Sequence, residues 1–440
     1  YKIDKINQDK TGYIRSLSLI RNNKYVGGKT KIDKITFYFF KEEDDLIKSA
    51  KRGGIQGLSI TNPKNYNFLK SGRFQSYNFP LPRYFTVFFN QDKLEILADR
   101  KIREALNYGT NKEEIIKTAL AGKGKIVHSP ILPEIYGLKS PEKIYNFDKS
   151  KAEELLDEAG FKKNEGEKIR ENPIQEKTVF QFKSELKTGS RGNEVAELQK
   201  CLAKDPEVFP GGEITSFFGQ QTKDAVILFQ EKYAKDILEP QGLKEGNGIV
   251  KKATRDKLNE LCAASLQETL PLKITLTVPK KDLLEKVAEL IKNQWGELGV
   301  QVEIKTFDAL SSEREIIKER NYEALLFGEV LLSLPDPLPF WHSLQKRDPG
   351  FNLALYQNKE ADKLLEEARK TLDPEIRSQK LDGFQNILIA DAPSLFLFNQ
   401  DYLYFITKEI KGIKEQTIVD PSKRFSDVEN WYIQTKRVWE

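Results

Sequence analysis

The chain has no methionine and only two cysteines and two histidines among its 440 residues. The histidines, His128 and His342, are far apart, and no H-E-x-x-H, C-x-x-C or phosphate-binding G-x-x-x-x-G-K-[ST] motif occurs. A G-x-S-x-G nucleophile turn is missing as well. These absences argue against the common metal, nucleotide and serine-nucleophile enzymes, so we predict no metal, no cofactor and no catalytic residue. A glycosidase pair among the 66 acidic residues stays open.

Long apolar stretches and an excess of one charge are also lacking. No run of about 18 apolar residues occurs, so nothing in the sequence is expected to span a membrane. The 71 basic and 66 acidic residues nearly cancel to a net charge of +5, which is too weak to indicate a nucleic-acid partner. We expect no signal peptide within the sequence, because the opening Tyr1-Lys2-Ile3-Asp4 is typical of a strand inside a domain. The length predicts two or three domains.

The segment 186–262 has the pattern of a small helical domain. Three stretches each begin with a turn that contains glycine and continue with apolar residues at helical spacing. Thr222 and Thr254 are placed as caps of the second and third helices. The apolar stripes of the three helices are Val195, Leu198 and Leu202; Ala225, Val226 and Phe229; and Leu258 and Leu261.

This segment resembles the three-helix type of peptidoglycan-binding domain. The pattern G-x-x-G-x-x-V-x-x-L-Q followed by F-G-x-x-T-x-x-A-V-x-x-F-Q is present in order. The resemblance implies a cell-wall location and a peptidoglycan partner. Four residues near the helix ends are the candidates for contact with glycan: Phe218, Gln221, Tyr233 and Arg255.

Both cysteines lie in this segment, Cys201 on the first predicted helix and Cys262 on the last. Two separately buried thiols are the preferred interpretation. A disulfide across the three-helix core is the alternative, which an oxidising compartment would permit.

The sequence that follows the helical segment indicates a βαβ unit. A strand over 273–278 precedes an amphipathic helix, and a second strand over 300–305 follows Gly299. The buried stripe of the helix comprises Val287, Leu290, Ile291 and Trp295. Two such strands are expected to be parallel, with a right-handed connection.

Outside the helical segment, the chain resembles the extracellular solute-binding proteins of peptide importers, family 5. The resemblance is carried by YFTVFFN at 84–90, RKIREALNYGTNKEEII at 100–116, the Pro-Asp-Pro turn at 335–337 and APSLFLF at 392–398. The opening segment with NNKYVGGK before a strand also fits. The resemblance implies an α/β, two-lobed periplasmic-binding-protein-like fold with a small inserted all-α three-helix domain.

The resemblance also implies a division of the chain. Residues 1–88 would form part of lobe I, 89–177 the first part of lobe II, 178–266 the insert, 267–396 the second part of lobe II, and 397–440 the return to lobe I. Hinge strands are expected near 82–90 and 393–399. Family members carry roughly a hundred or more residues ahead of this segment, so we expect much of lobe I, and an export signal or anchor, to be missing.

For ligand binding, the informative loop lies between Phe327 and Ser343. A buried ligand ammonium requires a carboxylate, because an unpaired charge removed from water costs several kcal/mol, roughly. The family places this acid three residues before the second Asp of a sequence such as A-D-Y-P-D-P, and here that position holds Ser333. Glu329 is the candidate substitute, while Asp336 is interpreted as a turn residue.

The remaining candidates are aromatic or polar residues near the expected cleft. Trp341 is either a stacking platform for the ligand or a core residue, and both interpretations stay open. His342 is a weaker candidate. Arg83, Tyr84 and Asn90 lie on the expected hinge strand and are candidates for the cleft floor.

The function that we predict is capture of peptides or peptide-like, possibly wall-derived, ligands outside the cytoplasm. The partners implied by the resemblance are a membrane permease and peptidoglycan, and the protein is expected to be a monomer, associated with membrane or wall. A wall-tethered scaffold or sensor that keeps the receptor fold without import is the main alternative. A wall-cutting enzyme is a third interpretation.

Overall fold

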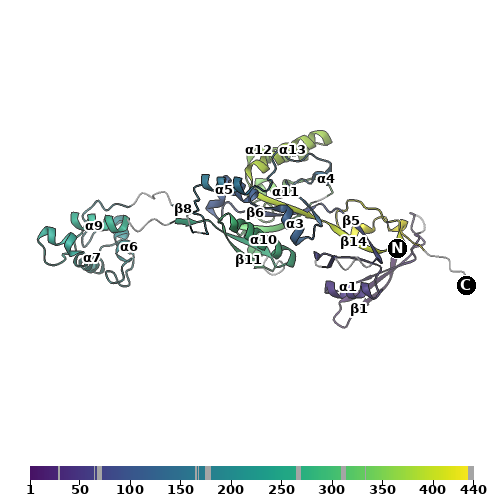
Figure 1. Ribbon diagram of the computed structural model, residues 1–440, viewed down its shortest axis with the longest axis horizontal. Helices are drawn as coiled ribbons and strands as arrows, with labels where there is room; N and C mark the ends of the chain where they lie inside the picture. Colours follow the sequence, from purple (N-terminus) through teal and green to yellow (C-terminus); the bar gives the residue numbers. More distant parts are fainter. Residues whose placement is uncertain are drawn as a thin grey trace. The chain divides into compact units, whose positions relative to one another are not determined.

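The computed structural model describes residues 1–27, 30–63, 65–66, 72–163, 166, 168–173, 180–263, 269–308, 314–331 and 333–434. It divides into two compact units, one formed by 1–170 with 272–440 and the other by 171–271 (Figure 1). The chain leaves the larger unit at Arg170 and re-enters it at Leu272, whose backbone N–H donates to the Arg170 carbonyl at 2.9 Å. The insertion therefore begins and ends at neighbouring positions. Its predicted edges, 178 and 266, lie outside the described residues.

The larger unit is built on a six-stranded mixed sheet. The strand order is β11 (Gln301–Phe307), β10 (Lys273–Pro279), β12 (Ala324–Val330), β6 (Arg83–Phe89), β13 (Ser394–Gln400) and β7 (Gly124–Ile126). Strand β10 is parallel to β11 and β12, whereas the other pairs are antiparallel. Strands β10 and β11 flank helix α10 (Asp282–Glu297). The predicted parallel βαβ unit is therefore confirmed.

Helices cover both faces of this sheet. Because successive side chains of a strand alternate between faces, Val87 and Phe89 of β6 face one core and Tyr84 and Phe88 the other. The first core contains Trp295 of α10 and residues of α2, α3 and α5. The second contains residues of α12 and α13, which Figure 1 shows on the side of the sheet away from α10. These helices are α2 (Arg100–Tyr108), α3 (Lys112–Ala119), α5 (Lys149–Glu158), α12 (Lys359–Lys370) and α13 (Pro374–Asp391).

Two three-stranded sheets form the other part of this unit. One has the order β1 (Lys2–Gln8), β2 (Ile14–Ile20), β3 (Lys34–Tyr38), and the other the order β4 (Gly57–Ser59), β14 (Tyr402–Thr407), β5 (Phe74–Phe79). The chain passes between sheets at 80–82 and at Asp401. Strands β6 and β13 thus lie within the six-stranded sheet. The crossing at 80–82 comes before the predicted lobe boundary at 88, and the crossing at Asp401 comes after the predicted lobe boundary at 397.

The remaining elements of the described chain are short apart from one helix. They are α1 (Glu43–Lys51), η2 (Glu95–Ala98), α4 (Pro133–Tyr136), η4 (Arg314–Lys318), α11 (Leu338–Trp341), η5 (Ser343–Gln345), β15 (Ile410–Lys411), η6 (Pro421–Phe425), η7 (Val428–Asn430) and β16 (Tyr432–Ile433). No helix within the described ranges is both long and apolar enough to cross a membrane.

The predicted three helices of the insert are present. They are α6 (Asn193–Leu202), α7 (Gln220–Lys232) and α9 (Lys252–Ala263), with α8 (Ala234–Ile237) and η3 (Glu239–Gln241) after α7, and β8 (Glu171–Pro173) pairs with β9 (Thr269–Pro271) at the stem. The predicted stripes lie in one core, where Val195, Leu198, Val226 and Leu258 are fully buried.

Thr222 and Thr254 are not helix caps, which corrects their sequence assignment. Each is buried inside the first turn of its helix and accepts a hydrogen bond from a buried glutamine of the preceding helix. Gln199 Nε2 donates to Thr222 Oγ1 at 2.9 Å, and Gln230 Nε2 donates to Thr254 Oγ1 at 3.0 Å. The two glutamines repeat one arrangement, in which the amide oxygen also accepts from two consecutive backbone N–H groups of the loop before the next helix.

We expect Gln199→Leu to destabilise the insert by about 3 kcal/mol or more, because it removes the partners of several buried polar groups at once. The backbone N–H groups of Thr215 and Ser216 both donate to Gln199 Oε1, at 2.9 and 3.0 Å. Urea denaturation followed by circular dichroism measures the loss. The matched control is Gln221→Leu at an exposed position of α7, where a change within about 0.5 kcal/mol is expected. Equal effects of the two substitutions would contradict the structural role of Gln199.

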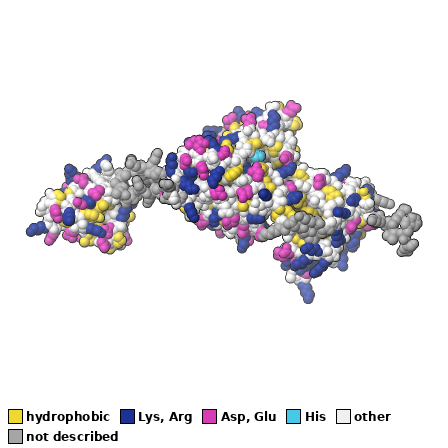
Figure 2. All heavy atoms as spheres, in the orientation of Figure 1, with side chains coloured by type: hydrophobic (Ala, Val, Ile, Leu, Met, Phe, Trp, Pro, Cys, Tyr) yellow, Lys and Arg dark blue, Asp and Glu magenta, His cyan; other side chains and the backbone are white. Residues whose placement is uncertain are grey.

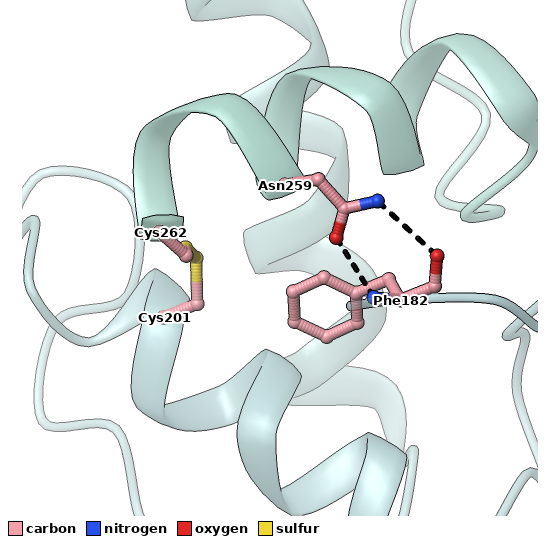
Figure 3. The surroundings of a disulfide bond; sticks show 4 residues. All are labelled: Phe182, Cys201, Asn259 and Cys262. Carbon is pink, nitrogen blue, oxygen red and sulfur yellow. Dashed lines mark hydrogen bonds between the residues drawn. A yellow bond between two sulfur atoms is a disulfide. The ribbon is translucent and has the colours of Figure 1, made fainter. Parts of the chain in front are cut away.

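A disulfide joins Cys201 of α6 to Cys262 of α9, with the Cα atoms 6.0 Å apart (Figure 3). The preferred sequence interpretation, two separate thiols, was therefore wrong, because the first and last helices bring the two side chains together. Asn259, one turn before Cys262, accepts from the Phe182 N–H at 2.7 Å and donates to the Phe182 carbonyl at 3.2 Å. The segment that enters the domain and its first helix are thus both tied to α9.

Candidate ligand site

A buried tyrosine–glutamate pair lies in the middle of the six-stranded sheet. Tyr84 of β6 and Glu329 of β12 are directly opposite each other in the antiparallel register, so their side chains share one face. The Tyr84 hydroxyl donates to Glu329 Oε2. Tyr84 is fully buried, and Glu329 is 3% exposed.

The environment of this pair favours a protonated carboxyl. Burial raises the pKa of Glu329 to about 8, and only the hydrogen bond from Tyr84 opposes the shift. Burial, followed by the charge of Glu329, also raises the pKa of Tyr84 well above 10. Glu329 Oε1 has no hydrogen-bond partner among the described residues. The cluster therefore offers one buried acceptor that is unused.

Trp341 belongs to the core, which decides between its two interpretations. Its indole is fully buried, with ring centroids 6.0 Å from Phe88, 5.7 Å from Phe396 and 6.5 Å from Tyr356. It closes the end of the second core beside Tyr84 and does not form an exposed stacking platform.

His342 is buried and held by structural contacts, and its contact with a ligand stays a prediction. Its side chain is 5% exposed; Nδ1 accepts from the Leu344 N–H at 3.1 Å, and Nε2 lies 3.3 Å from Glu366 Oε1. Asn90 is likewise buried in a turn, and its place in a cleft floor stays a prediction. It is 1% exposed, donates to the Arg320 carbonyl at 3.0 Å, and accepts from the Lys93 N–H at 3.0 Å.

Of the predicted ligand contacts, Ser333 lies at the surface and Arg83 lies near the crossing between sheets. Ser333 is exposed, and its neighbour Leu332 lies outside the described residues. Asp336 accepts from Arg369 at 2.6 Å, so it anchors the turn to helix α12 as well as shaping it. Arg83 is half-buried at the start of β6, where burial lowers the pKa of its guanidinium, and its Nε has no partner among the described residues.

A pocket of about 240 Å³ adjoins both crossings, and the sequence did not indicate it. It takes Asn78 and Pro80 from the first crossing and Asn399 and Asp401 from the second. Asn399 also ties the crossings together, because its Nδ2 donates to the carbonyls of Leu81 and Arg83. The other lining residues belong to β7, which pairs with β13, and to the segment that follows β7. They are Lys125–Ser129, Ile131–Ile135, Ser140 and Pro141.

His128 lines this pocket, and its Nδ1 has no partner among the described residues. Burial, with a smaller contribution from Lys112, lowers the pKa of His128 to about 4, so the ring is neutral near pH 7. The folded protein therefore loses stability from this group as the pH falls below about 6.5 towards 4. Lys125 and Glu134 form an ion pair at the rim. A mostly apolar pocket with a few polar groups fits a small organic ligand.

In the insert, the four residues predicted to contact glycan do not share one environment. Phe218 is fully buried in the three-helix core, so its assignment to a binding surface was wrong. Gln221 is exposed, and Tyr233 is half-buried between Phe229 and the ammonium of Lys257, which lies 5.4 Å from its ring centroid. Arg255 is half-buried. Contact of the last three with glycan stays a prediction.

Arg103 of α2 is structural. Its guanidinium donates to the carbonyls of Leu97 and Ala98 at 2.7 and 2.9 Å, and to those of Asp391 and Ala392 at the end of α13 at 2.7 and 3.1 Å. Within the described ranges, no group of three or more His, Cys, Asp or Glu side chains is placed to hold a metal ion.

Comparison with known proteins identifies related sequences. Residues 1–204 match the profile of bacterial extracellular solute-binding proteins, family 5 Middle. The oligopeptide-binding protein AppA of Bacillus subtilis is 20% identical over 422 residues, which is 95% of this chain and 59% of that protein. The probable D,D-dipeptide-binding periplasmic protein DdpA of Escherichia coli is 29% identical over 131 residues, 29% of this chain and 25% of that protein.

Solved structures share the fold. AppA from Bacillus subtilis in complex with a nonapeptide matches with a TM-score of 0.61 and 17% identity, over 98% of this chain and 66% of that one. CtaP from Listeria monocytogenes matches with a TM-score of 0.65 and 20% identity over the same shares. The larger unit therefore has the two-lobed α/β fold of periplasmic binding proteins, as predicted. The chain spans less than two thirds of the length of these relatives.

Proposed function

We propose that this chain, which shares its fold with peptide-binding proteins and its first 204 residues with the family 5 profile, captures peptides outside the cytoplasm for an ABC importer. The observation that carries the proposal is the pocket at the two crossings, where polar groups converge on an apolar lining. In a two-lobed receptor this is the place where a ligand would hold the lobes together.

The chemistry of the larger unit supports a ligand with an amino group. Glu329 Oε1 is a buried acceptor with no partner among the described residues, and an ammonium placed against it would favour the charged carboxylate. The exposed Ser333, at the position of the usual acid, supplies no charge. Glu329 is 3% exposed, so a ligand would reach it only if the residues that cover it moved.

Relatives with this fold bind ligands of several classes, so the ligand class is itself part of the proposal. DppA from Helicobacter pylori is solved with the peptide STSA, NikZ from Campylobacter jejuni with Ni(L-His), and AgaA with agropinic acid. Native mass spectrometry of the purified chain after incubation with a mixture of dipeptides to nonapeptides, muropeptides and Ni(L-His) would identify the retained species. Retention of peptides or muropeptides supports the proposal; retention of Ni(L-His) alone would replace it.

We further propose that the insert keeps the receptor near the cell wall and raises the local concentration of wall-derived peptides. The exposed Gln221 and the half-buried Tyr233 and Arg255 remain available for wall contact. Sedimentation with purified sacculi tests this. The full chain is expected in the pellet, and a variant with 171–271 replaced by a two-glycine turn between Arg170 and Leu272 is expected in the supernatant. Equal sedimentation of both would remove wall binding from the account.

A scaffold or sensor that retains the receptor fold without import is the alternative function. The observation that favours it is the loss of the usual anchor, with Ser333 at the surface and Trp341 inside the core. The importer is expected to bind a peptide ligand, whereas the scaffold is not. A permease partner, a monomeric state and association with membrane or wall belong to the proposal for the importer.

A further inference from the structure

Lys112, the first residue of α3, is a buried lysine whose charge is unbalanced. It is 4% exposed, and its ammonium has no hydrogen-bond or ion-pair partner among the described residues. Burial lowers the pKa of Lys112 to about 8, and the charge of the exposed Glu113 opposes this shift, so the ammonium is mostly protonated at pH 7. Lysine is almost never fully buried unless it is paired, because a buried charge without a partner costs free energy.

The fold brings His128 beside Lys112. Helix α3 ends in a turn in which the Gly122 N–H donates to the Ile116 carbonyl at 3.0 Å, and β7 then packs against α3. The helix is about 11 Å long from Lys112 to its end, and the extended chain from the start of β7 to His128 covers about 13 Å. His128 therefore returns to the level of the first turn of α3. After burial, the charge of Lys112 is the largest cause of the lowered pKa of His128, which agrees with this placement.

His128 connects this charge with the pocket at the crossings. His128 lines the pocket, whereas Lys112 is not among the lining residues. Among the described residues, the imidazole has no hydrogen-bond partner at its buried Nδ1. A neutral imidazole carries one N–H, which can donate to a ligand. The pocket wall thus offers a hydrogen-bond donor with an unbalanced positive charge next to it.

The other charged side chains of the pocket lie apart from His128. Lys125 and Glu134 pair with each other at the rim. Asp401 lies at the start of β7, where its N–H donates to the Lys123 carbonyl at 3.4 Å. His128 is five residues further along the extended chain, roughly 16 Å from that point. A negatively charged group of a ligand is therefore repelled at the Asp401 end of the pocket and accepted at the His128 end.

The surface of the larger unit does not favour anions by itself. Figure 2 shows Lys and Arg side chains interspersed with Asp and Glu side chains on the visible face of this unit. Such a surface has no large area of one sign that would attract anions from a distance. Selection of an anionic group would therefore depend on the buried charge of Lys112.

We propose that the His128 end of the pocket binds a carboxylate of the ligand, with the imidazole as hydrogen-bond donor and the Lys112 ammonium as the balancing charge. The inference rests on the proposed capture of peptides and deepens it, because it makes the ligand a peptide with a free C-terminal carboxylate. A C-terminal amide accepts a hydrogen bond but does not balance a charge. Lys112 does not line the pocket, so it acts on the carboxylate through its charge.

NMR of the imidazole groups tests the site directly, because the chain contains only two histidines. His128→Asn removes one of the two signals and thereby assigns both. N-acetylalanine, which has a carboxylate and no ammonium, is expected to move the His128 signal and to raise the pKa of His128 by at least about one pH unit. N-acetylalanine amide, and sodium chloride at the same ionic strength, should leave the signal in place.

Lys112→Gln removes the buried charge and keeps the length of the side chain. It should raise the pKa of His128 in the free protein and weaken the binding of N-acetylalanine by at least about fivefold. The matched control is Lys117→Gln, which removes a charge from an exposed position of the same helix and should change neither value. The same pKa of His128 in wild type and Lys112→Gln would overturn the role of Lys112.

The titrations of the wild type decide the proposal without any variant. An unmoved His128 signal with N-acetylalanine at tens of millimolar, or equal movement with its amide, would overturn the carboxylate site. Equal movement with chloride would overturn it too, since the site would then hold an adventitious ion only.

Melting with trialanine and with its C-terminal amide separates this inference from the proposed peptide capture. The free acid is expected to raise the melting temperature of the larger unit more than the amide does. Equal shifts would overturn the carboxylate site and leave peptide capture in place. A shift with neither peptide would count against peptide capture, and the NMR titration would still decide whether the pocket binds a carboxylate.

Discussion

Glu329→Gln is expected to stabilise the protein at pH 8 by about 4 kcal/mol and to leave its stability near pH 4.5 almost unchanged. The folded state holds the carboxyl with a pKa of about 8, against 4.5 for the unfolded reference. Between these values the folded state binds one more proton than the unfolded state, so stability falls by about 1.4 kcal/mol for each pH unit gained. Glutamine keeps the size of the side chain and accepts from Tyr84, but it does not ionise. Urea denaturation from pH 4.5 to 8.5 measures the effect.

Tyr84→Phe is the companion variant. Because the Tyr84 hydroxyl donates to Glu329 and lowers its pKa, removal of the hydroxyl should extend the loss of stability to higher pH. His128 acts in the opposite direction between about pH 4 and 6.5, so it offsets the Glu329 effect between about pH 4.5 and 6.5. The difference between wild type and Glu329→Gln isolates the contribution of Glu329. Parallel pH profiles for wild type and Glu329→Gln would contradict a buried, protonated Glu329.

Removal of the disulfide by Cys201→Ser with Cys262→Ser is expected to destabilise the insert by about 4 kcal/mol. The bond closes a loop with a sequence separation of 61, and the chain-entropy relation gives this magnitude for such a loop. The larger unit has its own cores and does not contain these cysteines, so its unfolding transition should stay in place. Calorimetry with and without a reductant resolves the two transitions.

The double-serine variant also serves as the control for reduction. A reductant should shift the transition of the insert in the wild type and leave that of the variant unchanged. If the reductant shifts neither transition in either protein, the two helices are not held by this bond. If it shifts the transition of the larger unit, the independence of the two units would be contradicted.

Periodicity was sufficient to predict the elements with continuous apolar stripes. The strand–helix–strand unit from Lys273 to Phe307 and the three helices of the insert follow from spacing alone, because each buries one face. The positions of Thr222 and Thr254 near the predicted helix starts led to their wrong assignment as caps. A threonine near a helix start is typical of a cap, whereas here each satisfies a buried glutamine from another helix, a contact that is not local in sequence.

The site depends on contacts between segments that are distant in the sequence, and local sequence patterns do not reveal such contacts. Tyr84 and Glu329 meet because β6 and β12 pair with a register that places them opposite each other. Phe218 was assigned to a surface and Trp341 was left open between surface and core, but each closes a core. The pocket beside His128 forms where two crossings and a loop converge, and the composition of none of these segments marks it.

The central claim, capture of a peptide by the larger unit, is tested most directly by thermal melting with dipeptides to nonapeptides and with muropeptides. A ligand at about 100 times its dissociation constant adds roughly 2.7 kcal/mol and should raise the melting temperature of the larger unit by a few degrees. The account predicts such a shift with free peptides and a smaller one with their N-acetylated forms. No shift with any of these ligands, while the chain still sediments with sacculi, would contradict peptide capture and favour the wall-bound scaffold.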